Sequence, residues 1–278
     1  MDEHLRDEAR YELRHPRPSV VAAIAALELR PGMRLIDIGC GPGAHLGLFV
    51  EDVAPGGAVV GLDSDAERLV IAAELHPELA AARSVRLEEG DLHDLPFEDD
   101  AFDVAWMSSV LHHEEQPLDA LAEMARVTRP GGLVAVLDGD TGGSFPCLPW
   151  PPAFELRLRA ADLRAQEDSY GGTLLYHFSG FTGRALPRLL REAGLVDVKL
   201  DAFTEVDRAP LDPPRERELC NWYLNSFGRR IHDYLAPRDW EQLRAYVTPE
   251  SDSYLLSDPD FFQARVMFLG LGRSTPPR

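Results

Sequence analysis

Short apolar runs alternate with longer amphipathic segments through the first half of the chain. The apolar runs cover residues 33–39, 58–63, 84–89, 102–107 and 133–138. Several of them are apolar without alternation, which is typical of strands that are covered on both faces. Because helical segments separate these runs, the pattern predicts an α/β fold, in which a mostly parallel sheet carries helices on its faces.

The segments between the predicted strands carry helix signals. Residues 18–29 form an amphipathic segment that we expect to pack on the sheet before the first strand. Ser64 stands three residues before Glu67, a spacing that predicts a capping box and the start of a helix. Apolar residues repeat at helical spacing over residues 117–127, and RPGG at 129–132 is expected to end that helix.

The second half of the chain has a more interrupted pattern. We expect residues 1–140 to be the cofactor-binding half of a single domain with N-terminal helices, and residues 141–278 to complete the sheet and add a lid. We expect further strands of the sheet within about 185–206 and 263–272. The proline-rich insertions that form the lid are expected at about 141–182 and 207–260.

Aromatic residues are concentrated in this second half. Residues 145–278 hold 18 of the 23 aromatic side chains. Aromatic side chains supply large contact areas and recognise flat apolar ligands. A small lid also needs large side chains to form a core of its own. The concentration therefore leaves two explanations open, a substrate pocket and a lid core.

The composition is that of a globular protein with a strongly acidic balance. Apolar residues make up 45% of the 278 residues and charged residues 27%, as in ordinary globular domains. The formal net charge of -19 would repel a phosphate backbone or an anionic membrane surface, so we expect no nucleic-acid partner and no membrane partner. The apolar runs are too short to span a bilayer and the first residues are charged, so we expect a cytoplasmic protein.

The cysteines and the acidic residues beside the histidines give no sign of a metal site. Cys40, Cys147 and Cys220 are odd in number and far apart, so we expect three reduced thiols. Glu114 and Glu115 follow two histidines, but no second well-spaced set of ligands accompanies them. We therefore expect no bound metal.

The strongest local motif is LIDIGCGPGAH at residues 35–45. Gly39 and Gly41 allow the positive φ angles of a strand that turns at once into a helix, and they leave room for a bound cofactor. Gly43 lets the following helix start close to the sheet. With Ala44 the loop also satisfies the GxGxxA form of a dinucleotide-binding loop, so the glycines alone do not identify the ligand.

Three acidic residues narrow the choice of ligand. Asp37, inside the loop, would repel a pyrophosphate and attract an ammonium group. Asp63 ends the next predicted strand, where a carboxylate can bind two ribose hydroxyls. Asp91 follows the third strand and could accept a hydrogen bond from the exocyclic amine of adenine. Together they predict a ligand with an amino acid end, a ribose and an adenine, but no phosphate.

On four linked motifs the sequence resembles the class I S-adenosylmethionine-dependent methyltransferases, within the ubiquinone and menaquinone biosynthesis-like group. The motifs are LIDIGCGPG, VVGLDSD, EGDLHDLPFEDDAFDVAWMSSVLHH and RPGGLVAVLD, in the family's order and at its intervals. The resemblance is strong over about residues 18–140 and holds only in outline beyond them. It implies a Rossmann-like sheet of seven strands in the order 3-2-1-4-5-7-6, the last antiparallel, flanked by helices and carrying a helical lid.

The resemblance also implies a cofactor and the residues that hold it. The cofactor is S-adenosylmethionine, and its product is S-adenosylhomocysteine. The implied binding residues follow the first four strands: Asp37, Gly39, Cys40, Gly41 and Gly43 at the methionine portion, Asp63 and Ser64 at the ribose and adenine, Asp91 and Leu92 at the adenine, and Met107 and Ser108 at the sulfonium end.

Two adjacent histidines are the candidates for catalysis. His112 and His113 lie just beyond the fourth strand, at the edge where open α/β folds bind ligands. Either could act as a general base toward a phenol or hydroxyl acceptor. The VLHH motif is shared by family members with very different substrates, so a structural role stays open for both. Candidates for the wall of the substrate pocket are Tyr11, His15, Tyr176 and Trp222.

Three functions remain open from the sequence. The first is methyl transfer to an oxygen, nitrogen or carbon atom of an apolar small molecule, with an aromatic or polyketide-like acceptor. The second is a cyclisation or decarboxylation by an enzyme that binds the same cofactor, because a fold does not determine the chemistry. The third is an NAD-type oxidoreductase built on the GxGxxA loop. In each case we expect a monomer or homodimer that acts on a small molecule.

Overall fold

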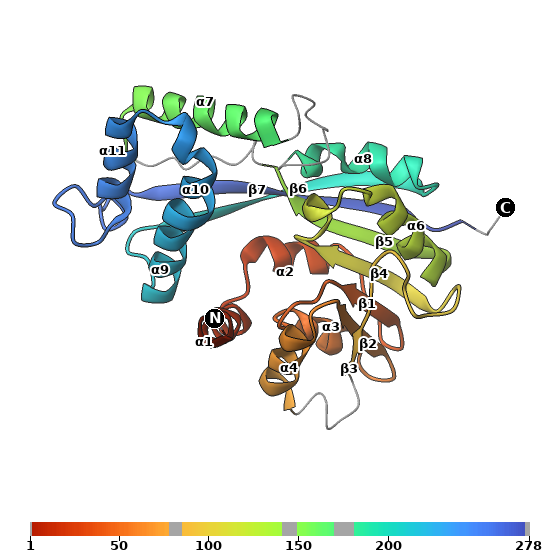
Figure 1. The fold of residues 1–278 in the computed structure, drawn as a ribbon. Coiled ribbons are helices and arrows are strands. Elements are labelled where there is room, and N and C mark those ends of the chain that lie inside the picture. The colour runs from red at the N-terminus through yellow and green to blue at the C-terminus, as the bar shows by residue number, and fades with distance from the viewer. Residues whose placement is uncertain (1, 78–84, 141–148, 170–180, 276–278) are drawn as a thin grey trace. The chain divides into compact units, whose positions relative to one another are not determined.

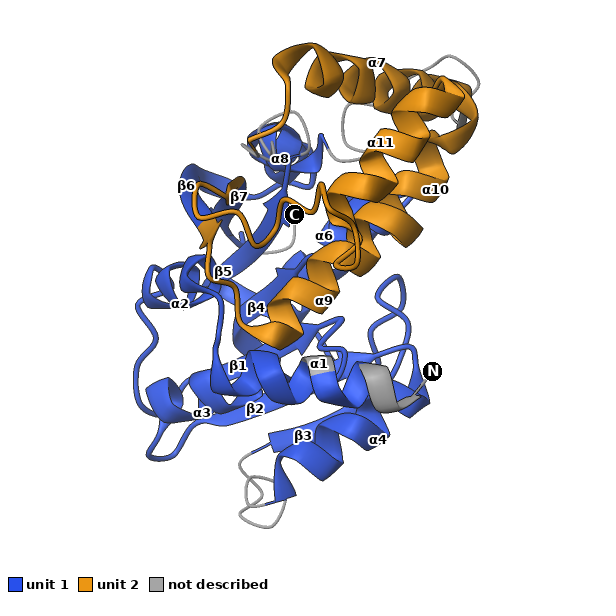
Figure 2. Ribbon diagram, turned by 90° about the vertical axis from the view of Figure 1, so that its left-hand side faces the viewer, with its two compact units in different colours: residues 1–143, 176–205, 266–278 blue, residues 144–175, 206–265 orange. Residues whose placement is uncertain are grey.

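The structure is a computed structural model, and it describes residues 2–77, 85–140, 149–169 and 181–275. The chain divides into two compact units, shown in two colours in Figure 2. Unit 1 comprises residues 1–143, 176–205 and 266–278, and unit 2 comprises residues 144–175 and 206–265. None of the described helices is long and apolar enough to cross a membrane.

Unit 1 is built around a seven-stranded sheet in the order β3-β2-β1-β4-β5-β7-β6 (Figure 1). The strands are β1 (Arg34–Ile38), β2 (Ala58–Asp63), β3 (Val85–Glu89), β4 (Phe102–Ser108), β5 (Thr128–Gly139), β6 (Val196–Arg208) and β7 (Phe262–Arg273). The first five strands pair in parallel, whereas β7 runs antiparallel to β5. The strand order and the antiparallel seventh strand confirm the predicted fold class.

Helices cover both faces of the sheet, because successive residues of a strand point to opposite faces. Ile36 belongs to a core shared with α6 (Pro117–Val127) and α8 (Thr182–Glu192). Its neighbour Leu35 belongs to a second core shared with α2 (Pro18–Ala25) and α3 (Leu46–Val53). Among the described residues of unit 1, α1 (Asp2–Arg14) and α4 (Ala66–Leu75) are further α-helices. Burial on both faces explains the continuous apolar runs of the central strands.

The start of α4 differs from the prediction by one residue. The N-cap is Asp65 rather than Ser64, and its side chain accepts a hydrogen bond from the Glu67 N–H at 2.9 Å. The physical reason lies in Asp63, whose carboxylate accepts the Asp65 N–H at 2.9 Å. The backbone is therefore still extended at Asp65, and the helix begins only after it.

Two further boundaries differ from the prediction. The helix expected over residues 18–29 ends at Ala25, and Glu28 adopts a left-handed φ of 52° that no α-helix continues through. The RPGG prediction is confirmed, because α6 ends at Val127, but strand β5 begins at Thr128, before the apolar run at 133–138 that predicted it. The Gly131 N–H donates to the Ser274 carbonyl at 2.9 Å and the Gly132 carbonyl accepts the Ser274 N–H at 3.1 Å, while Gly131 has a positive φ of 77° and the pairing of β5 with β4 is irregular here.

Unit 2 is helical and has its own core. Its helices are α7 (Pro152–Ser169), α9 (Pro213–Asn221), the π-helix η2 (Trp222–Phe227), α10 (Gly228–Ile231), the 3-10 helix η3 (His232–Tyr234) and α11 (Pro237–Val247). Trp150, Phe154 and Tyr223 are buried and meet edge to face, with ring centroids 5.5 and 5.9 Å from Trp150. These aromatic residues of the second half of the chain therefore form a core of unit 2. The role of this unit as a lid stays a prediction.

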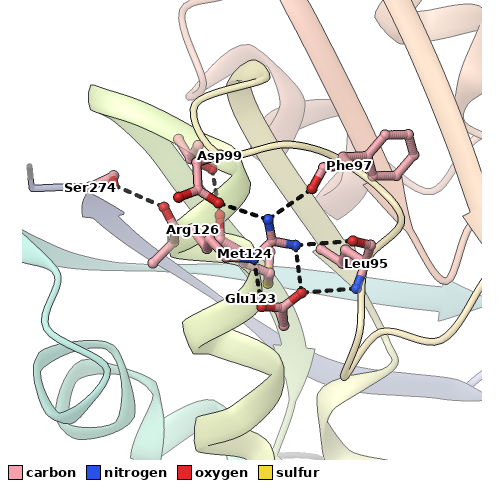
Figure 3. A network of polar contacts seen from close by, with 9 residues as sticks. Leu95, Phe97, Asp99, Glu123, Met124, Arg126 and Ser274 are labelled. Atoms are coloured by element: carbon pink, nitrogen blue, oxygen red, sulfur yellow. Dashed lines mark hydrogen bonds and ion pairs between the residues drawn. The ribbon is translucent and has the colours of Figure 1, made fainter. Parts of the chain in front are cut away.

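A polar network around Arg126, at the end of α6, holds the segment between β3 and β4 (Figure 3). Its guanidinium donates to the backbone oxygens of Leu95 and Phe97 at 3.0 and 2.8 Å, and to the carboxylates of Glu123 and Asp99. Glu123 in turn accepts the Leu95 N–H at 2.8 Å. The segment that carries Asp91 is thus attached to a buried helix by charge-assisted bonds, which are stronger than neutral ones.

We expect Arg126→Met to lower the free energy of unfolding by about 1–3 kcal/mol, because it leaves partly buried acceptors and a carboxylate without their donor. Urea-induced unfolding measures this value. Arg10→Ala is the matched control, since it removes an exposed ion pair with Asp7 and should change stability by less than about 0.5 kcal/mol. Equal stability of Arg126→Met and the wild type would contradict the role given to the network.

Candidate functional site

A cavity of about 1150 Å³ lies where β1, β2, β3 and β4 end. All of its lining residues belong to unit 1. Parallel strands bring their carboxyl ends to one edge of a sheet, and open α/β folds bind ligands there. Of the residues predicted for the site, those that line the cavity are Asp37, Gly39, Cys40, Gly41, Asp63, Ser64, Asp91, Leu92, Ser108 and His113.

The glycine loop between β1 and α3 forms one wall of the cavity. Gly39 and Gly41 have positive φ angles of 73° and 54°, which L side chains rarely adopt. A Cβ at Gly39 would also collide with Val110, whereas nothing lies near the position of a Cβ at Gly41. The loop is held from behind by His76, whose buried Nε2 lies 2.7 Å from the Gly43 carbonyl oxygen.

Asp63, at the end of β2, ties the loop to the neighbouring strand. Its Oδ2 accepts the Gly41 N–H at 2.8 Å and its Oδ1 accepts the Asp65 N–H at 2.9 Å. The side chain is buried and still lines the cavity. Because a carboxylate offers about four acceptor positions, Asp63 can accept further hydrogen bonds from a ligand.

Asp37 is the most perturbed acid of the cavity. It is only 2% exposed, and the described part of the chain offers it no hydrogen bond or ion pair. Burial raises its pKa to about 7, His45 opposes this effect, and the negative charge of Asp63 adds to it. A carboxylate in this state gains strongly from a cationic ligand, because an opposite charge favours its ionised form.

The loops after β3 and β4 meet across the cavity. Asp91 accepts the His93 N–H at 2.9 Å, which shapes the first of these loops. His93 is also hydrogen-bonded to Glu114 of the second loop, with Nε2 and Oε2 2.9 Å apart. Both partners line the cavity, so the contact joins the wall near Asp91 to the wall near the two histidines.

The histidine pair occupies the 3-10 helix η1 (Leu111–His113), and its two rings are 3.8 Å apart between centroids. Only His113 lines the cavity. His112 is bound to Asp138 of β5, through its Nδ1 at 2.9 Å and its backbone N–H at 3.0 Å. Burial lowers the pKa of His112, but the hydrogen bond and charge of Asp138 outweigh it and raise that pKa overall. Burial and the charge of His112 lower the pKa of His113.

Several cavity residues were not predicted from the sequence. Glu12 and Arg17 come from the N-terminal segment and form an ion pair at 3.2 Å, and Arg17 also lies 4.0 Å from Glu205 of β6. Buried Ser19 donates to Glu205 as well. Glu205 is far from the glycine loop in the chain, and a single glutamate near the end of a strand carries no local signal of a site. His45 is a loop residue whose Nε2 lies 3.7 Å from Glu12.

Other predicted residues lie away from the cavity lining. Gly43 belongs to the loop but packs against Leu46 and Ala72. Met107 is fully buried in a core, so only its neighbour Ser108 reaches the cavity wall. Tyr11 and His15 stack on each other with centroids 4.6 Å apart. Trp222 belongs to unit 2, and Tyr176 lies outside the described residues.

No group of three or more metal-ligating side chains occurs within the residues that the structure describes. Cys40 and Cys220 are free thiols, and Cys147 lies outside those residues. Burial and the neighbouring charges of Asp37 and Asp63 raise the pKa of the Cys40 thiol. Cys40 is therefore an unreactive wall of the cavity at neutral pH.

The cavity residues fit the expected cofactor. Asp37 offers a buried, unpartnered carboxylate to an ammonium group, and Asp63 keeps acceptor positions for hydroxyl donors. Gly41 has open space where a side chain would stand. A pyrophosphate would meet repulsion from the same two acids. The charge pattern thus favours S-adenosylmethionine over a dinucleotide.

Comparisons with known proteins point to one family. Residues 36–136 match the family model described as methyltransferase domain. An uncharacterised 37.1 kDa protein of transposon Tn4556 from Streptomyces fradiae is 36% identical over 220 residues, which cover 76% of this chain and 60% of that protein. The demethylmenaquinone methyltransferase of Staphylococcus aureus (strain JH9) is 31% identical over 183 residues, which cover 63% of this chain and 73% of that enzyme.

The fold agrees with these matches. The solved structure of the YcgJ protein from Bacillus subtilis superposes with a TM-score of 0.56 at 19% identity, over 93% of this chain and 99% of that one. The family match covers most of the strands β1 to β5, and the ends of the first four of these form the cavity. Together with the staphylococcal relative, it shows that this chain belongs to the class I S-adenosylmethionine-dependent methyltransferases.

Proposed function

We propose that this protein transfers the methyl group of S-adenosylmethionine to an oxygen, nitrogen or carbon atom of an apolar small molecule of aromatic or polyketide-like character. The observation that carries the proposal is the cavity in which Asp37, Asp63 and Asp91 meet. Its volume of about 1150 Å³ exceeds the roughly 300–1,000 Å³ of a typical small-molecule pocket. It therefore has room for an acceptor beside the cofactor.

In this proposal the three acids bind three parts of the cofactor. Asp37 holds the ammonium group, Asp63 accepts from the ribose hydroxyls, and Asp91 with Leu92 meets the adenine. The separation of these acids over the ends of β1, β2 and β3 supports the assignment. Ser108, the last residue of β4, lies on the side where the methyl group is expected.

Two aromatic pairs support an aromatic or polyketide-like acceptor. Trp222 remains 39% exposed and stacks on Phe227 with centroids 5.2 Å apart, so it offers a flat apolar surface within unit 2. Tyr11 and His15 offer a second stacked pair in unit 1. The sequence-based assignment of Tyr11, His15, Tyr176 and Trp222 to the substrate pocket stays a prediction.

The main task of the protein in methyl transfer is to align the acceptor atom with the methyl group. S-adenosylmethionine supplies a methyl group that its sulfonium centre has already activated. Holding the acceptor in line can contribute on the order of 7–11 kcal/mol to lowering the barrier. A hydroxyl acceptor also needs a group that takes its proton, and η1 places two histidines at this edge of the cavity.

Calorimetry and isotope transfer test the proposal. Titration should show micromolar binding of S-adenosylmethionine and no binding of NADH. Incubation with methyl-labelled cofactor and a panel of phenols, hydroquinones and aromatic polyketides should then yield a product that carries the label. A product formed without the label would overturn methyl transfer in favour of a cyclisation or decarboxylation, and binding of NADH alone would overturn the cofactor assignment.

Asp37 predicts a pH dependence of cofactor affinity. Its pKa of about 7 in the free protein means that a cationic ligand must displace a proton below that pH. We therefore expect the affinity to fall on the order of tenfold per pH unit as the pH drops from 7 to 5.5, and to level off above 7. Titrations in buffers of different ionisation enthalpy should show proton release on binding.

The matched variants for this pH dependence are Asp37→Asn and Asp91→Asn. Both should bind the cofactor more weakly, but only Asp37→Asn should lose the slope between pH 5.5 and 7. A slope that survives in Asp37→Asn would show that another group releases the proton.

Asp63→Ala should weaken cofactor binding at least about tenfold, because it removes charge-assisted hydrogen bonds worth roughly 1.5–3 kcal/mol each. It also frees the Gly41 N–H, so the loop loses its anchor. Asp65→Ala is the control: it removes the cap of α4 and should cost about 1 kcal/mol of stability while affinity stays within about threefold. Unchanged affinity of Asp63→Ala, measured by calorimetry, would show that Asp63 is misassigned.

A further inference from the structure

A buried carboxylate beside the site is used neither by the proposed cofactor contacts nor by the sheet. Asp138 is 1% exposed, at the carboxyl end of β5. Its Oδ1 lies 2.9 Å from His112 Nδ1 and accepts the Gly139 N–H at 2.7 Å. Its Oδ2 accepts the His112 N–H at 3.0 Å. One carboxylate therefore fixes both the backbone and the ring of His112.

These contacts determine the state of the His112 ring. An ionised carboxylate only accepts hydrogen bonds, so Nδ1 must carry the proton that lies between the two groups. A histidine held by a carboxylate in this way favours its imidazolium form. The hydrogen bond and charge of Asp138 raise the pKa of His112 and so favour its charged form, in which the ring has no lone pair to accept another proton.

His113 is in the opposite situation. Its ring centroid lies 3.8 Å from that of His112, with the two ring planes tilted by 45°, and the residue lines the cavity. The other charged groups that face it are Asp138, Glu114 of the same loop and Arg68 of α4. Burial and the charge of His112 lower the pKa of His113, which favours its neutral form, and that form keeps a lone pair.

We propose that the two histidines have different roles: His113 is the catalytic proton acceptor, and Asp138 and His112 are positioning residues that hold it. This proposal rests on the proposed methyl transfer. The proton of an acceptor hydroxyl moves to the His113 imidazole as the oxygen forms its bond to the methyl carbon. The carbon–sulfur bond breaks with its electron pair on sulfur. The proton then leaves His113 to solvent, which the repulsion from His112 favours.

The titration of the two rings tests this arrangement without any substrate. In the ¹⁵N-labelled, cofactor-free full chain, NMR should show His112 titrating above and His113 below the ordinary histidine pKa of about 6.5. Signals are assigned with His112→Asn and His113→Gln. His112→Asn keeps a donor for Asp138 but removes the positive charge, so the pKa of His113 should rise. An unchanged His113 pKa in this variant, or the reverse order in the wild type, would overturn the proposal.

Asp138→Asn is the second variant, and it should lower the pKa of His112. Asp103→Asn is its matched control, because Asp103 also accepts a backbone N–H, from Arg34, and pairs with a cation, Arg129, but at the opposite end of β4. The control should leave both histidine signals in place. If Asp138→Asn does not fold by circular dichroism, His112→Asn decides the question alone.

Steady-state kinetics with the methyl acceptor found by isotope transfer distinguish the catalytic role of His113 from the positioning role of His112. His113→Gln should lower kcat by about 10²–10⁴-fold without changing cofactor affinity. His112→Asn should stay active, with the acidic limb of its kcat/KM profile moved to higher pH. If His112→Asn lost activity while His113→Gln kept it, His112 would be the proton acceptor, and the proposed roles would be overturned. Failure of methyl transfer itself would show as no labelled product from the wild type, with the NMR result unaffected.

Discussion

The hydrogen bond from the Gly41 amide to the Asp63 carboxylate is the contact on which the site depends. It joins the loop after β1 to the end of β2, and the same carboxylate sets where α4 begins through the Asp65 N–H. With two positive φ angles in the loop, the backbone would have many alternatives without this anchor. One acid thus shapes the loop, starts a helix and still faces the cavity.

The electrostatics of the cavity follow from placing several acids at one sheet edge. Asp37 and Asp63 are both buried, and the negative charge of Asp63 adds to the burial that raises the pKa of Asp37. Such a site is incomplete without positive charge, and S-adenosylmethionine carries it on both its ammonium and its sulfonium. The overall charge of -19 describes the whole surface, whereas the choice of cofactor class comes from these few carboxylates.

The loops after β3 and β4 are connected through side chains rather than through the sheet. The His93–Glu114 hydrogen bond joins them at the cavity, and Arg126 ties the rest of the β3–β4 segment to α6. The adenine end and the acceptor end of the proposed site are therefore parts of one network. Rigid support of this kind keeps reacting groups aligned, which is where this class of chemistry gains most.

The sequence by itself determined the elements and the cofactor. Apolar runs without alternation marked the central strands, and the three acids at strand ends described an adenosyl amino acid, because both signals are local in the chain. The family resemblance added the strand order.

Only the tertiary structure decided what lies around the cofactor. Glu205 and Arg17 reach the cavity from elements far from the glycine loop, and no local pattern links such distant residues. The adjacent histidines looked equivalent in the sequence. They differ because β5 places Asp138 against His112 and leaves His113 at the cavity, and the environment of a side chain, not its identity, sets its protonation state.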